Sequence, residues 1–179
     1  MLEVCSAVLI LVDVQGKLAQ TMYAREQLLQ NLQRMLKGAQ ILGIPILWLE
    51  QNPRGLGPTT PELAALLSEA QPISKLCFSC CGCSDFVDAL EVTQRRQVLL
   101  VGIEAHVCIY QTAADLLARG YHVEIVADAV SSRSAENRQI GLDRMRALGA
   151  GITSTEMALF ELLKVAEGPQ FKAILALVR

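Results

Sequence analysis

The sequence of 179 residues lacks the features by which membrane and secreted proteins are usually identified. No apolar run approaches the roughly 20 residues that a helix needs to cross a bilayer, so no membrane partner is expected. The opening segment MLEVCSAVLILVDVQ has neither a basic leader nor a small-residue cleavage site, so no signal peptide is expected. These absences favour a cytoplasmic location, where thiols stay reduced and a disulfide framework is not expected.

A strong charge of one sign is missing as well. The 16 Lys and Arg residues against 18 Asp and Glu residues give a formal net charge of −2. The basic residues are scattered along the chain and form no basic block. Because proteins hold nucleic acids by neutralising phosphates with clustered Lys and Arg, nucleic acid is not an expected partner.

Two common cofactor-binding loops are absent after the first apolar run. The segment VDVQGKLAQ contains no G-x-G-x-x-G, which a dinucleotide-binding turn requires. Gly16 and Lys17 resemble the end of a phosphate-binding loop, but Leu11 and Leu18 occupy the positions of its first Gly and its Ser or Thr. We therefore expect no nucleotide cofactor, and indeed no cofactor at all.

What the chain does have is a regular alternation of strand-length apolar runs and helical patterns. Strands are expected at residues 6–13, 44–50, 72–75, 97–102, 121–128 and 151–155. Helices are expected at residues 25–42, 61–70, 84–92, 107–118 and 134–148, and two closing helices contain FELLK and FKAILALV. This alternation predicts one three-layer α/β domain over residues 1–179, with a mostly parallel sheet of about six strands and helices on both faces.

Cysteines are unevenly distributed, because Cys77, Cys80, Cys81 and Cys83 lie within seven positions. Their spacing begins like the C-x₂-C-x₂-C run of an iron–sulfur protein, but Val87 stands where the fourth ligand belongs. No second C-x₂-C pair follows at the spacing of a zinc ribbon. The cluster leaves open a thiolate metal-binding or redox-sensing protein, whereas free cysteines more often pack a loop and the start of a helix.

Three residues with reactive side chains lie at, or shortly after, the ends of three of the expected strands. Ligands of parallel α/β sheets bind at the carboxyl ends of the strands, which is where Asp13, Lys75 and Cys108 are expected. A carboxylate that closes a wholly apolar strand is costly unless it has a partner or a function. We expect a nearby lysine and a position in the first turn of a helix to lower the pKa of Cys108 and favour its thiolate.

The residues around these positions resemble the isochorismatase-like cysteine hydrolase family. The resemblance rests on LVDVQ with Asp13, K-x-x-F-S from Lys75, and GIEAHVCIYQTA with Cys108, supported by EQNPRGLGPTTPEL and VADAVSSR. It implies a Rossmann-like fold, self-association, and a triad in which Asp13 is the base, Lys75 the electrostatic partner and Cys108 the nucleophile. It also implies a cis peptide bond between Ile103 and Glu104, with the backbone N–H groups of Glu104 and Cys108 forming an oxyanion hole.

The chain departs from the metal-binding nicotinamidases of that family. Those enzymes carry Asp and His ligands after the second strand, where this chain has Glu50, Gln51 and Asn52, so no metal site is expected. The residues expected to line the pocket of a small-molecule substrate are Gln15, Gln51, Asn52, Phe78 and Ile109.

The expected function is hydrolysis of an amide, carbamoyl or related C–N bond through a thiol-bound acyl intermediate. A mean hydropathy of +0.35 and the family resemblance both predict a homo-oligomer. A catalytically idle oligomeric scaffold is the other alternative to an enzyme.

Overall fold

The computed structural model describes residues 1–68 and 70–179 of the chain. Six parallel strands form one sheet in the order β3-β2-β1-β4-β5-β6. The strands are β1 (Ala7–Val12), β2 (Ile46–Gln51), β3 (Ile73–Lys75), β4 (Gln97–Ile103), β5 (His122–Ser131) and β6 (Gly151–Thr153). The parallel sheet predicted from the apolar runs is therefore confirmed.

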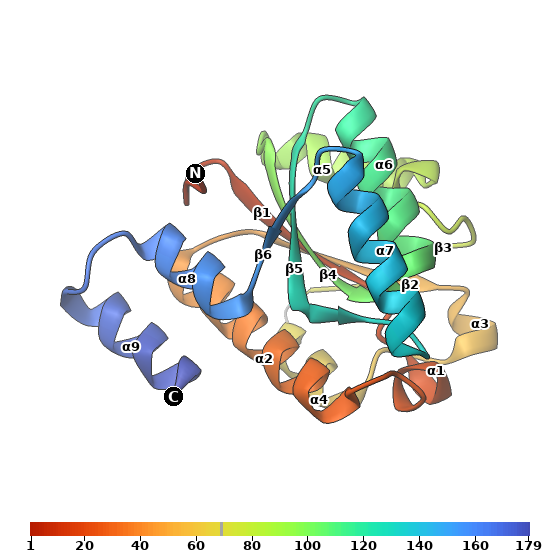
Figure 1. Ribbon diagram of the computed structural model, residues 1–179, viewed down its shortest axis with the longest axis horizontal. Coiled ribbons are helices and arrows are strands. Elements are labelled where there is room, and N and C mark those ends of the chain that lie inside the picture. The colour runs from red at the N-terminus through yellow and green to blue at the C-terminus, as the bar shows by residue number, and fades with distance from the viewer. Residues whose placement is uncertain (69) are drawn as a thin grey trace.

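Helices lie on both faces of this sheet, as the alternating pattern predicts (Figure 1). The α-helices are α1 (Gly16–Gln20), α2 (Arg25–Leu42), α3 (Pro53–Leu56), α4 (Pro61–Ala64), α5 (Ser84–Thr93), α6 (Tyr110–Ala118), α7 (Ala135–Ala147), α8 (Thr155–Leu163) and α9 (Gly168–Val178). Two 3₁₀ turns, η1 (Ala65–Leu67) and η2 (Cys80–Gly82), and a π-helical turn, η3 (Ala105–Ile109), complete the described elements. In the described part of the chain, no helix is both long and apolar enough to span a bilayer.

The central strand β1 supplies side chains to two separate cores. Leu9 and Leu11 pack with α2 and α8 on one face, whereas Val8 and Ile10 pack with α5, α6 and α7 on the other. All six residues of β1 are buried, because both faces of a doubly covered parallel strand are removed from water. This explains the continuous apolar run in the sequence and confirms the three-layer architecture.

Several helix ends follow the local sequence signals. Gly43 ends α2 in the left-handed conformation with φ of 67°, and the Ser134 side chain accepts a hydrogen bond from Asn137 N at the start of α7. The helix expected over residues 84–92 begins at Ser84, where Cys83 occupies the cap position and makes no side-chain cap bond. The helix expected over residues 61–70 is divided into α4 and η1, and position 69 lies outside the described residues.

Gly102 allows the ends of β1 and β4 to approach closely. Its φ is 117°, and a Cβ at this position would lie 2.1 Å from the carbonyl oxygen of Val12 on the neighbouring strand. Only glycine fits such an approach without displacement of backbone. The close pairing of Val12 with Gly102 brings the residues that follow these two strands to the same edge of the sheet.

Candidate active site

A buried ion pair lies at the carboxyl edge of the sheet. Lys75 Nζ, at the end of β3, donates to Asp13 Oδ2 at 2.7 Å, and the two side chains are 0% and 2% exposed. The ammonium also donates to Gln51 Oε1 at 2.7 Å and to the carbonyl oxygens of Cys77 and Phe78 at 3.2 and 3.1 Å. An ammonium that has lost its water is tolerated in the interior only with such a set of acceptors.

The backbone turns sharply at Asp13, directly after β1. Its φ of 55° lies in the left-handed region, which aspartate enters more readily than most residues. The backbone N–H still donates to Leu49 O at 3.2 Å, so the turn starts from within the sheet. The second carboxylate oxygen, Oδ1, is buried and accepts no hydrogen bond of ordinary geometry from the described residues. One oxygen of Asp13 is thus bound to Lys75 and the other is available to a neighbour.

That neighbour is Cys108, which lies in the π-helical turn η3 before α6 begins. Its side chain is 7% exposed. Burial, together with the negative charge and hydrogen bonding of Asp13, raises the pKa of the Cys108 thiol to about 12, against the opposing effect of Lys75. The expectation that Cys108 rests as a thiolate is therefore wrong. Desolvation and a nearby carboxylate outweigh the lysine, and the residue lies outside the first turn of the α-helix.

The pKa values of the ion pair are shifted by the same burial. Burial raises the pKa of Asp13 above its ordinary value, although Lys75 opposes this shift. Burial alone would lower the pKa of Lys75, but the attraction of Asp13 gives a net increase, so the ammonium stays charged. The site thus combines a protonated thiol, a lysine cation and a carboxylate that is more basic than usual.

The turn that carries Cys108 is held by the segment that follows β5. The peptide bond between Ile103 and Glu104 is cis, as the family resemblance implies. Glu104 Oε2 accepts hydrogen bonds from the backbone N and the Nε of Arg133, at 3.0 and 3.2 Å. His106 Nδ1 lies 2.9 Å from Ser132 Oγ, so the histidine braces the turn against the end of β5. The oxyanion hole formed by the N–H groups of Glu104 and Cys108 stays a prediction.

Two of the five expected pocket residues make hydrogen bonds close to the ion pair. Gln51 Oε1 accepts from Lys75, as described above. Gln15 is fully buried, and its side-chain amide binds backbone groups: Nε2 donates to Gln51 O at 3.1 Å and to Gly57 O at 2.7 Å. Neither role was foreseen from the sequence, where an amide beside a strand end gives no sign of its partner.

The other three expected pocket residues are spread over different environments. Asn52 is exposed and adopts a φ of 38°, and the Phe78 side chain is 54% exposed on the loop after β3. Ile109 is fully buried in the core beneath α5, α6 and α7 and does not reach the surface. The structure therefore brings Asp13, Lys75, Gln51 and Cys108 together, but leaves Ile109 away from any open pocket.

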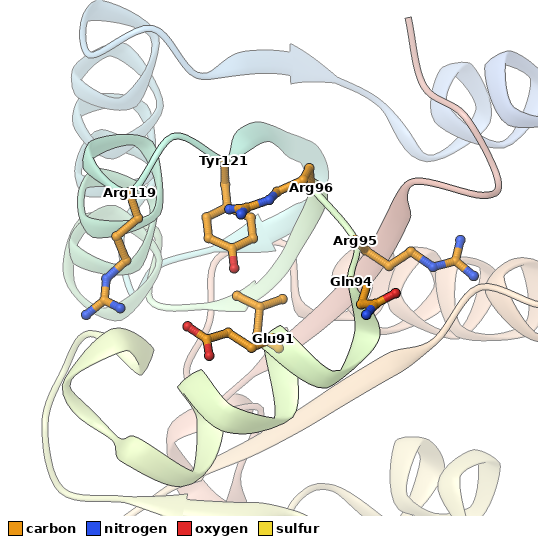
Figure 2. Close-up of a pocket in the computed structure, with 7 residues that line it drawn as sticks. Glu91, Gln94, Arg95, Arg96, Arg119 and Tyr121 are labelled. Carbon is orange, nitrogen blue, oxygen red and sulfur yellow. The ribbon is translucent and has the colours of Figure 1, made fainter.

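Hollows occur at both edges of the sheet. Beside the ion pair, a hollow of about 510 Å³ is lined by Asn52, Pro53, Arg54, Ser74, Lys75 and Leu76. At the opposite edge, where β4 and β5 begin, another of about 490 Å³ is lined by Leu90, Glu91, Gln94, Arg95, Arg96, Arg119 and Tyr121 (Figure 2). Its arginines diverge in Figure 2, and Arg96 lies over the ring of Tyr121 at 4.9 Å. This second hollow is remote from the candidate active site.

The cysteine cluster is part of a loop that packs on α6. Cys80 N donates to Thr112 Oγ1 at 3.0 Å, and Ser79 Oγ donates to Asp115 Oδ2 at 2.6 Å. Cys80 and Cys81 are buried. Over residues 1–68 and 70–179, no three His, Cys, Asp or Glu side chains are grouped closely enough to hold a metal ion. The metal-binding alternative therefore gains no support from the cluster.

Comparison with known proteins decides the family. Residues 7–157 match the isochorismatase domain. The chain belongs to the isochorismatase family. Isochorismatase domain-containing protein 2 of Bos taurus is 45% identical over 175 residues, which cover 97% of this chain and 83% of the relative.

Solved structures of related proteins have the same fold. The MAR1 ribonuclease of Caenorhabditis elegans superimposes with a TM-score of 0.92 at 38% identity, covering 99% of this chain and 91% of that one. The YcaC gene product of Escherichia coli, described as an octameric hydrolase of unknown specificity, has a TM-score of 0.91 at 25% identity, with coverages of 98% and 87%. The chain thus has the three-layer fold of the isochorismatase-like hydrolases.

Proposed function

We propose that this protein is a cysteine hydrolase that cleaves an amide, carbamoyl or related C–N bond of a small molecule. The observation that carries the proposal is the buried Asp13–Lys75 pair, of which one carboxylate oxygen is left without an ordinary hydrogen bond beside Cys108. A buried carboxylate next to a protonated thiol is the arrangement that a general base and its nucleophile require.

The high pKa of the thiol determines how the first step proceeds. Because Cys108 rests protonated, Asp13 accepts the Sγ proton while Sγ attacks the carbonyl carbon, and the carbonyl electron pair moves to oxygen. The backbone N–H groups of Glu104 and Cys108 would bind this oxyanion. Collapse of the intermediate breaks the C–N bond, the departing amine takes the proton from Asp13, and a thioester remains on Cys108.

Water completes the cycle through the same base. The oxygen of a water molecule attacks the thioester carbon while Asp13 accepts a proton from that water. The acid product is released as the C–S bond breaks, and the Cys108 thiolate takes the proton back from Asp13. Lys75 begins the cycle charged, since the attraction of Asp13 raises its pKa. Its role is to offset the negative charge that moves between Asp13, Cys108 and the oxyanion.

Metal-independent chemistry is part of the proposal. The side chains at the end of β2 are already engaged, because Glu50 Oε1 accepts from Thr59 N at 2.7 Å and from Thr59 Oγ1 at 2.8 Å. Gln51 binds Lys75. Both side chains are thus held by groups of the protein.

We also propose that the chain is a single domain of the cytoplasm that forms a homo-oligomer. The related YcaC gene product is described as octameric. Leu76 and Phe78, on the loop after β3, are 78% and 54% exposed and offer apolar surface to a partner. Burial of this loop against a second copy would remove them from water.

Ribonuclease activity is a second candidate, because the relative from Caenorhabditis elegans is described as a ribonuclease. The net charge of −2 opposes it, since RNA binding depends on phosphate neutralisation. Incubation of the purified protein with single-stranded and double-stranded RNA, beside Cys108→Ala, tests this candidate. Cleavage by the wild type but not by Cys108→Ala would replace the amide substrate with RNA.

The deciding experiment is a panel of simple amides, carbamoyl compounds and isochorismate. Isochorismate is included because fold alone does not determine the reaction. We expect turnover of small amides that is unaffected by EDTA, together with a mass increase on Cys108 when the reaction is quenched early. Turnover without any adduct in Cys108-containing peptides, and undiminished in Cys108→Ala, would rule out the covalent mechanism.

A further inference from the structure

The Lys75 ammonium is bound by two side chains and two backbone carbonyls. The carbonyls of Cys77 and Phe78 come from the loop that follows Lys75 itself and therefore move with it. Asp13 Oδ2 and Gln51 Oε1, each at 2.7 Å, come from β1 and β2. Gln51 is thus the neutral group that fixes the ammonium relative to the rest of the sheet.

Gln51 is itself held unusually firmly. Its Nε2 donates to Leu76 O at 2.7 Å, so the amide orientation is set and Oε1 faces Lys75. Its backbone is bracketed by the Gln15 side chain, which accepts from Gln51 N at 2.7 Å and donates to Gln51 O at 3.1 Å. The second Gln15 donor bond, to Gly57 O at 2.7 Å, ties this bracket to the turn after α3.

We propose that Gln51, held by Gln15, is a positioning residue for the triad. Its amide keeps the ammonium of Lys75 on Oδ2 of Asp13, and this leaves Oδ1 for the proton of Cys108. The inference rests on the proposed function of the triad. Both glutamines, which the sequence suggested as pocket residues, then hold the catalytic residues in position.

The neutrality of Gln51 is as important as its shape. One lysine cation here faces one carboxylate, so the buried pair carries no net charge. A carboxylate at position 51 would compete with Asp13 for the same ammonium and would add negative charge near the thiol. Like charges within a few ångströms raise the pKa of acids. Gln51→Glu should therefore raise the pKa of Cys108, whereas Gln51→Met should remove the bond to Lys75 without adding charge.

The test of Gln51→Glu needs no substrate. Far below the thiol pKa, the rate of Cys108 alkylation by iodoacetamide is proportional to the thiolate fraction, so a rise of one unit lowers it about tenfold. We expect Gln51→Glu to slow alkylation of the Cys108 peptide about tenfold at pH 8. The matched control is Gln97→Met, because Gln97 also brackets backbone, accepting from Glu3 N and donating to Met1 O at the opposite edge of the sheet.

The test of Gln51→Met uses hydrolysis of the amide found in the substrate panel. We expect kcat to fall about tenfold with KM changed less than about twofold, because the base and not the substrate is displaced. Gln97→Met should keep both constants and the wild-type alkylation rate. A wild-type alkylation rate in Gln51→Glu, or a kcat loss shared equally by Gln51→Met and Gln97→Met, overturns the proposal. Because the alkylation arm uses no substrate, failure to find a hydrolysed amide would leave its result intact.

Discussion

Cys108 and Cys80 are both buried thiols that interact with the charge of the same lysine, Lys75. Burial raises the pKa of both. They differ in their other neighbours, because Cys80 is hydrogen-bonded by Thr112, whereas Cys108 adjoins the carboxylate of Asp13. Cys80 is also completely inaccessible, while Cys108 keeps a small exposed surface. A nearby cation therefore does not distinguish the two thiols, whereas the adjoining carboxylate and the small exposed surface belong to Cys108 alone.

The same contrast separates two uses of one helix face. Cys108, Thr112 and Asp115 follow one another at helical spacing across η3 and α6. Thr112 and Asp115 hold the loop of the cysteine cluster, and the carbonyls of that loop bind Lys75. The loop of the cluster thus contacts the site through its backbone, while the thiols of Cys80 and Cys81 are buried.

The largest expected effect on activity is the loss of kcat in Cys108→Ala, for which Cys80→Ala is the comparison. Cys108→Ala should lower kcat by at least about 10³-fold, because it removes the nucleophile of the proposed covalent step. Cys80→Ala should keep kcat within about threefold and lower the free energy of unfolding by about 1 kcal/mol, because it leaves a small cavity. Steady-state kinetics and urea unfolding of both variants measure these effects. Equal loss of activity in both would erase the distinction between the thiols.

Asp13→Asn should have the next largest effect. The substitution preserves the shape of the side chain but removes the base, and a general base contributes about 10²–10⁴-fold. It also leaves the buried Lys75 cation without its counter-charge, which costs about 3–5 kcal/mol when a buried pair is broken. We expect kcat to fall by about 10²-fold or more, together with a lower Tm. Wild-type turnover in this variant would show that Asp13 only stabilises the fold.

Solvent access should be the main factor that determines how fast each of the six cysteines is alkylated. The exposed Cys5 should react with iodoacetamide before Cys108, and Cys80 should react only on unfolding. With a pKa of about 12, the thiolate fraction of Cys108 at pH 8 is on the order of 10⁻⁴. Peptide mapping of initial rates checks this order. If Cys108 is labelled before Cys5, its resting thiol is more acidic than the structure indicates.

Much of the fold could be predicted because its signals are local. The buried strand β1, the glycine that ends α2 and the serine that caps α7 each act through neighbours in sequence. The convergence of Asp13, Lys75 and Cys108 could also be predicted, since parallel strands present their carboxyl ends at one edge. These are consequences of chain geometry and need no knowledge of packing.

The state of the site could not be predicted in the same way. The pKa of Cys108 depends on burial and on the distance to Asp13, which are properties of the folded molecule. The roles of Gln15 and Gln51 depend on which carbonyls lie opposite them, far away in sequence. The short helices α1 and α3 carry too few residues to show an apolar period.

The smallest expected effect, and the most specific to the pairing of Cys108 with Asp13, lies in the pH profile. Burial raises the pKa of Asp13, and below this value the carboxyl is protonated and cannot accept the thiol proton. The acid limb of kcat/KM, which reports the free enzyme, should therefore lie above the usual range of an aspartic acid, with the rate falling as the pH drops through it. Lys75 gives no limb near neutrality, because its pKa is raised and it stays charged. Gln97→Met should keep the wild-type profile, whereas an acid limb in the ordinary aspartate range would place the catalytic base in a solvated position, outside the buried pair.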